Sequence, residues 1–293
     1  MEMPLEQVKL VVIDIDGTLL NPQKQITRRT HAAIQAARAE SIIVTLATAR
    51  RYGNTKPVAD ELGIDIPLIT YDGALLMHHP RREVVHAHPL AADIAQQAVN
   101  ILSQYHVQPI VHQMNENVEE TWSGLEAFDN PELAGYFAVF PDVYRLSYDE
   151  LCQDKPDPLR VVGFAQEKTI AQVVPDVARL DCAWYTIKRG SYGCAEICVM
   201  DTLCSKASGV IALARHLGIP LEQVMALGDN INDVEMLQAV GWGVAMGQSS
   251  ETVRSIAHAV TTSNAEDGVA VAIERYALRD ARYSDSNSFK RSI

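Results

Sequence analysis

The chain has 293 residues, 47% hydrophobic and 21% charged, and its 25 Lys and Arg against 37 Asp and Glu give a formal net charge of −12. This composition is ordinary for a globular protein and excludes fibrous, collagenous and largely disordered classes. The acidic balance predicts that nucleic acid is not a partner, because such partners are held by clustered positive charge. At about 150 residues per domain, the length fits two domains.

Targeting signals and cysteine usage predict the cellular compartment of the protein. No apolar stretch approaches the roughly 20 residues that a membrane-spanning helix needs, and the N-terminal residues MEMPLEQVKL do not resemble a signal peptide. The five cysteines contain no CxxC pair and are expected to be reduced and mostly buried. The sequence therefore predicts a cytoplasmic protein without a membrane partner and leaves the oligomeric state open.

The first part of the chain alternates strands and helices. The β-branched run Val8–Ile15 predicts a strand that is buried on both faces. Thr27 is expected to cap a helix that ends near Glu40, and further strands are predicted at 41–49 and 66–73 with a helix between them. This alternation is typical of a parallel α/β sheet.

After Asp72 the pattern changes to short strands around polar turns. Residues 74–90 and 182–199 each predict a hairpin, and hairpins are antiparallel. Between them the periodicity predicts helices at about 91–105 and 168–180 and strands near 107–112, 117–122 and 159–165. The sequence therefore predicts an α+β domain.

From Lys206 the alternation of helices and strands returns. Helices are predicted at 206–218, 232–240, 251–257 and 267–278, with strands at 223–229 and 242–246. The two outer parts of the chain are therefore expected to share one sheet, which gives a Rossmann-like α/β core of residues 1–81 and 200–278. Residues 82–199 form the inserted domain, and residues 279–293 are expected to be a flexible tail.

Acidic residues follow the first predicted strand. In DIDGTLL, Asp14 and Asp16 stand two apart where the chain leaves the sheet, the edge at which open α/β sheets bind ligands. Two carboxylates that face one crevice need a cation or a shared proton, and Mg²⁺ is the candidate that prefers oxygen ligands. The alternative is a plain Asp-Gly turn without chemistry.

A second acidic cluster follows a later strand. In ALGDNINDVEML, Asp229, Asn232 and Asp233 stand between an apolar strand and a helix, although Asp233 could simply favour the helix dipole. Thr48 ends the second strand and Lys206 begins a helix. Carboxylates with Mg²⁺, a hydroxyl and an ammonium are the groups that phosphoryl transfer uses. A receiver domain uses similar groups, but it has no place for so long an insertion.

Together these motifs resemble those of the haloacid dehalogenase superfamily. DIDGTLL, the Thr48 of LATAR, Lys206 and GDNINDVEML stand in the order of the four motifs of that superfamily. The insertion lies between the second and third motifs, where Cof-type sugar-phosphate phosphatases carry an α/β cap. TYDGALL, GVAMG and TSNAEDGVA are further marks, so the resemblance covers about 8–278.

The resemblance implies catalytic roles for four residues. Asp14 would be the nucleophile that forms an aspartyl-phosphate, and Asp16 the general acid and base. Thr48 and Lys206 would hold the phosphate. The implied activity is hydrolysis of a small phosphorylated metabolite, in particular a sugar phosphate.

The resemblance also implies a Mg²⁺ cofactor. Asp229, the Asp14 carboxylate and the Asp16 backbone carbonyl would bind the ion, while Asn232 and Asp233 would support the site. A phosphomutase with the same core and a non-catalytic regulator that binds a phosphorylated metabolite are the alternative functions.

The chain departs from the family pattern at three positions. Relatives usually read TGR, NGA and MGN where this chain has Ala49, Asp72 and Gln248. None of these changes removes an implied catalytic group. Asp72 adds a negative charge that should repel a phosphate unless a cation or a proton offsets it.

Other residues are candidates for substrate selection. Arg50 is one candidate. Lys188 and Arg189, at a hairpin tip of the insertion, are either contacts for an anionic substrate or solvated turn residues. The histidines at positions 78, 79, 86 and 88 lie in the other predicted hairpin, and we expect them to be solvated rather than to bind a metal.

Overall fold

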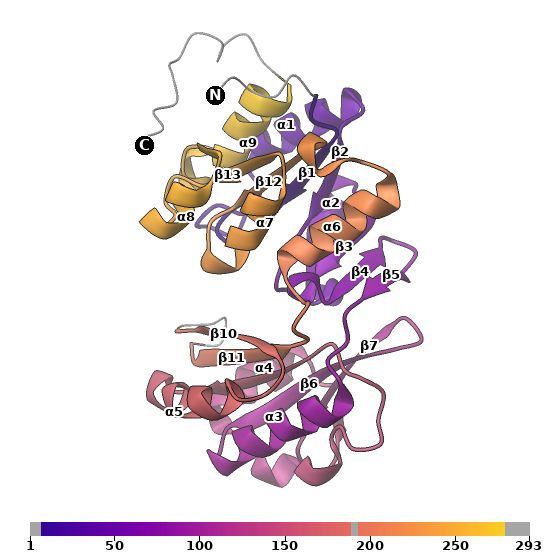
Figure 1. Cartoon of the computed structure of the whole chain (residues 1–293), viewed down its shortest axis with the longest axis vertical. Coiled ribbons are helices and arrows are strands. Elements are labelled where there is room, and N and C mark those ends of the chain that lie inside the picture. The colour runs from indigo at the N-terminus through magenta and orange to yellow at the C-terminus, as the bar shows by residue number, and fades with distance from the viewer. Residues whose placement is uncertain (1–6, 189–192, 279–293) are drawn as a thin grey trace. The chain divides into compact units, whose positions relative to one another are not determined.

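The computed structural model describes residues 7–188 and 193–278. The chain divides into two compact units (Figure 1). The core unit joins the chain up to His86 with the chain from Ser205 onward, and the cap unit spans Ala87–Cys204. The insertion expected from the sequence, 82–199, starts and ends slightly earlier. None of the helices in the described ranges has the length and apolar character needed to cross a membrane.

A parallel sheet forms the centre of the core unit. Its strand order is β14-β13-β12-β1-β2, and every neighbouring pair is parallel, which confirms the predicted α/β class. All of β1 is buried, as its unbroken apolar run predicts. The strands are β1 (Leu10–Ile13), β2 (Ile43–Leu46), β12 (Val224–Gly228), β13 (Trp242–Ala245) and β14 (Ala259–Val260).

A smaller sheet continues from the edge of this one. A parallel bridge between Ala47 and Ile69 connects the β2 side to β3 (Pro67–Thr70). The strands β4 (Leu75–His78) and β5 (Glu83–Ala87) complete the order β3-β4-β5, with β3 and β4 antiparallel. The first predicted hairpin therefore extends the core unit.

Helices cover both faces of the parallel sheet. Leu10 and Val12 pack with residues of α6 and α7, whereas Val11 and Ile13 point to the opposite face, where α1 packs against α9 (Figure 1). As predicted, Thr27 caps α1 and its side chain accepts a hydrogen bond from the Thr30 amide. The helices are α1 (Arg28–Ala39), α2 (Tyr52–Leu62), α6 (Lys206–Leu217), α7 (Val234–Ala239), α8 (Glu251–Ile256) and α9 (Gly268–Ala272).

Several predicted helices differ from the observed ones. The helix expected at 232–240 begins as the 3₁₀ turn Ile231–Asp233, because the Asp233 carboxylate accepts hydrogen bonds from the backbone ahead of it and tightens the chain there. The helix expected at 267–278 is α9 followed by a π-helical turn, Ile273–Ala277. Further 3₁₀ turns are Tyr71–Gly73, Leu221–Gln223 and Asn264–Glu266 in the core unit and Glu126–Phe128, Pro131–Leu133 and Tyr148–Glu150 in the cap unit.

The cap unit has a six-stranded sheet in the order β10-β11-β9-β6-β7-β8. Neighbours are antiparallel except for β7 and β8, as expected for an α+β domain. The helices α3 (Ala92–Gln104) and α5 (Glu167–Val177) contribute to one apolar cluster with strand residues such as Val111 and Val161. The other elements are α4 (Ala134–Val139), β6 (Gln108–Asn115), β7 (Val118–Ser123), β8 (Val143–Arg145), β9 (Arg160–Ala165), β10 (Ala183–Ile187) and β11 (Ala195–Met200).

Candidate active site

Two carboxylates meet at the carboxyl edge of the parallel sheet. Asp14 follows β1 directly and Asp229 follows β12, and the two strands are paired with Ile13 opposite Leu227. Because parallel neighbours end at the same edge, both side chains leave the sheet there. Asp14 is 4% exposed, so its charge needs a partner.

Lys206 supplies that partner from the first turn of α6. Its ammonium donates hydrogen bonds to Oδ1 of Asp14 at 2.7 Å and to Oδ1 of Asp233 at 2.6 Å. The lysine is 2% exposed, and Asp233 is fully buried. Burial alone would lower the pKa of Lys206, but Asp14, Asp233 and Asp72 outweigh it and raise that pKa. The ammonium is therefore held in its charged form.

The clustered carboxylates outnumber the single ammonium of Lys206. One oxygen each of Asp14, Asp229 and Asp233 lie within 4.8 Å of one another. If all three are ionised, Lys206 leaves two negative charges, which is the charge that a divalent cation offsets. Oxygen donors alone suit a hard cation, so these three residues fit a hard divalent cation.

Burial gives these carboxylates unusual pKa values. It raises the pKa of Asp229 to about 6, helped by the charge of Asp233 and opposed by a hydrogen bond from Thr18. Burial also raises the pKa of Asp14, although the charge of Lys206 opposes it. A cation at the cluster would favour the ionised form of both groups.

The loop after β1 is shaped around Asp229. Gly17 has φ +89°, and a Cβ atom there would lie only 2.7 Å from Cγ of Asp229. Any other residue at this position would therefore be strained. The hydroxyl of Thr18 donates to Oδ1 of Asp229 at 3.1 Å. Gln248 Nε2 donates to the Gly17 carbonyl oxygen at 2.6 Å. Neither contact was predicted from the sequence, although the threonine of DIDGTLL could have indicated the first.

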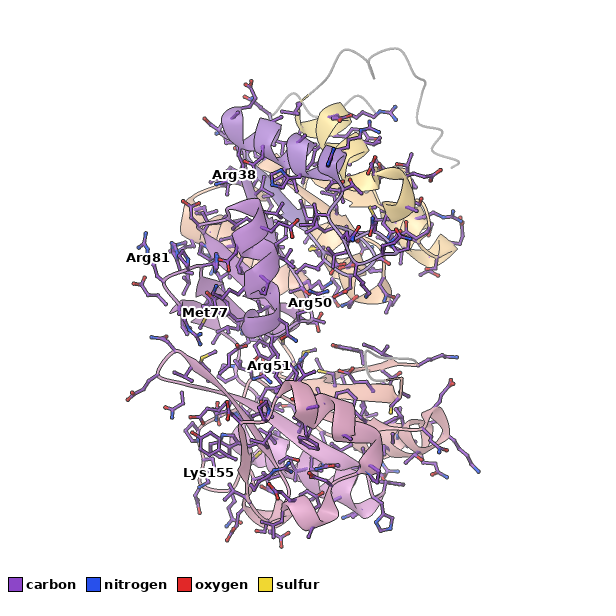
Figure 2. The ribbon with its side chains drawn as sticks, turned by 180° about the vertical axis from the view of Figure 1, so that it is seen from behind. Arg38, Arg50, Arg51, Met77, Arg81 and Lys155 are labelled. Atoms are coloured by element: carbon purple, nitrogen blue, oxygen red, sulfur yellow. The ribbon has the colours of Figure 1, made fainter. Side chains whose placement is uncertain are left out.

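Asp16 lies apart from this cluster and pairs with Arg50. Nε and Nη2 of Arg50, which lies just before α2 (Figure 2), donate to the two Asp16 oxygens at 2.6 and 2.7 Å. Lys24 adds a third cationic contact at 3.4 Å. Burial alone would raise the pKa of Asp16, but the hydrogen bonds and charge of Arg50, with Lys24, lower it. Arg50, predicted to select substrate, thus contacts the predicted general acid.

Thr48 lies beyond the end of β2 and is 1% exposed. Its hydroxyl oxygen accepts from the Arg50 amide at 3.1 Å, which leaves the hydroxyl proton to be donated elsewhere. Its carbonyl oxygen accepts from the Asp72 amide at 3.0 Å. Asn232 reaches the same turn, since its Nδ2 donates to Oδ1 of Asp72 at 2.9 Å.

Of the two predicted residues of the cap hairpin, only Lys188 lies within the described part of the chain. Lys188 is exposed at the end of β10 and pairs with Glu167 at 3.3 Å. Arg189 lies outside the described residues. Selection of substrate by this hairpin stays a prediction.

One sequence-based expectation about the histidines is wrong. His79 is only 2% exposed, and its Nδ1 lies 3.0 Å from the Tyr52 hydroxyl while its Nε2 lies 3.1 Å from Oδ1 of Asp60. Its partners are on α2, far along the chain, so the local hairpin pattern did not reveal the burial of this side chain.

Comparisons with known proteins agree with this geometry. The family described as haloacid dehalogenase-like hydrolase matches residues 11–273. The putative phosphatase YxeH of Bacillus subtilis is 31% identical, and the alignment covers 92% of this chain and 98% of YxeH. The 5-amino-6-(5-phospho-D-ribitylamino)uracil phosphatase YitU of Bacillus subtilis is 26% identical over 91% of this chain and 97% of YitU.

A solved structure supports the same conclusion. The HAD subclass IIB sugar phosphatase BT4131 superposes with a TM-score of 0.73 at 25% identity, covering 92% of this chain and 99% of that one. The predicted family, fold class and enzyme class, a phosphoric monoester hydrolase, are thereby confirmed. The chain belongs to the haloacid dehalogenase-like hydrolases.

Proposed function

We propose that this enzyme is a Mg²⁺-dependent phosphatase that hydrolyses a small phosphorylated metabolite through an aspartyl-phosphate on Asp14. The observation that carries the proposal is the cluster of Asp14, Asp229 and Asp233 within 4.8 Å, bridged by the buried ammonium of Lys206. It combines a nucleophile, ligands for a hard cation and a fixed positive charge.

The residues divide the reaction between them. An Asp14 oxygen attacks phosphorus, and the bond from phosphorus to the ester oxygen breaks as the leaving alcohol takes a proton from Asp16. Water then attacks the aspartyl-phosphate and gives a proton to Asp16, which releases phosphate and restores the Asp14 carboxylate. Lys206 and the Thr48 hydroxyl would hold the phosphoryl oxygens. Bound Mg²⁺ would neutralise their charge as it develops.

Asp16 must change state before it can act as an acid. In the free protein its pKa is lowered by Arg50, so it starts as a carboxylate. We propose that substrate draws Arg50 away from Asp16, which then takes up the proton that it donates. Arg50 would thereby contribute to the choice of an anionic substrate.

The names of the relatives support the proposed substrate class. YitU is named for 5-amino-6-(5-phospho-D-ribitylamino)uracil, a Serratia proteamaculans relative for HMP-PP, and an Escherichia coli relative for pyridoxal phosphate. We propose a small phosphate monoester, in particular a sugar phosphate, with selection by the cap unit. Activity in the cytoplasm stays a prediction.

A panel of sugar, nucleotide and cofactor phosphate esters tests the proposal. We expect phosphate release with Mg²⁺ and none in excess chelator, with activity restored when the ion is returned. Full hydrolysis in chelator would contradict it, as would transfer of the phosphoryl group within the substrate without release. Asp16→Asn should slow hydrolysis by about 10²- to 10⁴-fold, the usual worth of general acid catalysis.

A further inference from the structure

Asp72 is a buried acidic residue in the 3₁₀ turn Tyr71–Gly73. It is 2% exposed and lies between β3 and β4 with φ 52° and ψ 34°, a left-handed conformation that Asp and Asn tolerate better than most residues. The next residue, Gly73, has φ +93°, and a Cβ atom there would collide with the Ser205 carbonyl group ahead of α6. The turn therefore has little freedom to move.

This turn places Asp72 close to the catalytic lysine and to Asn232. Its charge is one of those that raise the pKa of Lys206. Its Oδ1 accepts the 2.9 Å hydrogen bond from Nδ2 of Asn232. Asn232 belongs to the 3₁₀ turn Ile231–Asp233, so it shares a short segment with two of the clustered carboxylates, Asp229 and Asp233.

The chemistry of Asp72 fixes which end of the Asn232 amide faces it. The Asp72 oxygen accepts from Asn232, so Asn232 turns its NH₂ group toward Asp72. The amide oxygen of Asn232 then points the other way. An asparagine at position 72 could accept or donate, and it would allow Asn232 to sit in either orientation.

We infer that Asp72 is a positioning residue that holds Asn232 with its amide oxygen available as an acceptor for the divalent cation or for water around it. This inference rests on the proposed function, because it assumes a cation at the Asp14, Asp229 and Asp233 cluster. It explains why a negative charge is kept beside a phosphate site, where it would otherwise only repel substrate.

Mg²⁺ binding to the full chain without substrate tests the inference. Calorimetric titration would compare the wild type with Asp72→Asn, Asn232→Ala and the double variant. Since each single change alters the hydrogen bond between Asn232 and Asp72, we expect it to weaken Mg²⁺ binding roughly two- to tenfold. Because Asp72 acts through Asn232, the double variant should bind no more weakly than Asn232→Ala alone.

A matched control separates positioning from damage to the fold. Asp267 also has a left-handed backbone, with φ 58° and ψ 36°, and its carboxylate accepts a hydrogen bond from Thr27 at 2.6 Å. Asp267→Asn makes the same chemical change in the same unit, and it should leave Mg²⁺ binding unchanged. The unfolding temperature of each variant without Mg²⁺ would be measured alongside.

Each outcome decides the inference. Unchanged Mg²⁺ binding in Asp72→Asn overturns it, and so does equal weakening in Asp267→Asn. Additive losses in the double variant also overturn it, because Asp72 would then act on the ion by its charge alone. Should Asp72→Asn fail to fold, wild-type Mg²⁺ binding by Asn232→Ala would still refute it. If the wild type binds Mg²⁺ but hydrolyses no ester, only the proposed function is contradicted. If the wild type binds no Mg²⁺, both the proposed function and the inference about Asp72 are contradicted.

Discussion

The two units pair charged groups in different ways, in a largely buried cluster in the core unit and in a half-buried pair in the cap unit. In the core unit, Asp14 and Asp233 share a single ammonium, and Asp229 adds a further carboxylate. In the cap unit, Arg145 donates two hydrogen bonds to Asp129, at 2.6 and 3.0 Å, and Gln108 adds another at 2.6 Å. The core cluster keeps an excess of negative charge, whereas the cap pair is balanced.

This contrast indicates which buried polar groups serve binding and which serve the fold. A balanced pair with further hydrogen bonds contributes to one packed arrangement of its domain. An unbalanced cluster costs stability when no cation is bound, and it is retained because something external completes it.

Of the changes that compare the two units, Lys206→Ala is expected to have the largest effect. Removing the ammonium leaves Asp14 and Asp233 buried without their shared partner, and removes a charge aimed at the phosphoryl group. We expect kcat/KM to fall by roughly 10²- to 10³-fold. The matched control is Lys56→Ala, which breaks an exposed pair with Asp60 in the same unit and should change little. Equal kcat/KM values in Lys206→Ala and wild type would contradict the claim that the charge cluster of the core unit serves the reaction.

A smaller effect is expected in the cap unit from Asp129→Ala. The change leaves Arg145 and Gln108 without their common acceptor, which should destabilise the protein by about 1 to 3 kcal/mol. Hydrolysis of a small aryl phosphate should keep its kcat within about twofold, because the chemistry belongs to the core unit. Urea unfolding and steady-state kinetics measure the two effects. A large loss of kcat with unchanged stability would assign Asp129 to catalysis.

The smallest effect concerns pH. In the folded protein the pKa of Asp229 is about 6, above its ordinary value of 3.8, so the folded state holds this proton more tightly than the unfolded chain does. In the absence of a cation, the stabilisation that comes from protonated Asp229 is therefore present at low pH. It is lost as the pH rises from about 4 to about 6. Mg²⁺ binding must displace the proton, so its affinity should fall up to about tenfold per pH unit below the pKa.

Titration with Mg²⁺ at pH 5, 6, 7 and 8 would measure this dependence. Asp229→Asn has no such proton to displace, so its weaker binding should vary less with pH. Identical wild-type affinities at pH 5 and pH 8 would show that Asp229 does not bind the ion.

The sequence allowed much of the fold and of the catalytic edge to be predicted, for a physical reason. A buried parallel strand such as β1 has an unbroken apolar run, and acidic residues directly after two such strands must emerge at the same edge. The parallel pairing of the strands also followed from the alternation of helix and strand. The family and the enzyme class could be predicted because these motifs recur with fixed spacing.

Contacts between distant segments could not be predicted in the same way. The pair of Asp72 with Asn232, the pair of Arg50 with Asp16 and the burial of His79 beside Tyr52 all depend on how separate elements pack. Local periodicity indicates which face of an element is apolar, but it does not say which polar side chain of another element will meet it.

Chemical trapping of the covalent intermediate tests the central claim most directly. Wild-type enzyme would be mixed with Mg²⁺ and an active ester, quenched in acid during turnover, reduced with borohydride and digested. We expect borohydride to reduce an acyl phosphate at Asp14. The same peptide should be unmodified when chelator replaces Mg²⁺ and in the Asp14→Asn variant. Asp14→Asn should also have lost turnover. Rapid hydrolysis with Asp14 unmodified throughout, or wild-type turnover by Asp14→Asn, would contradict the account.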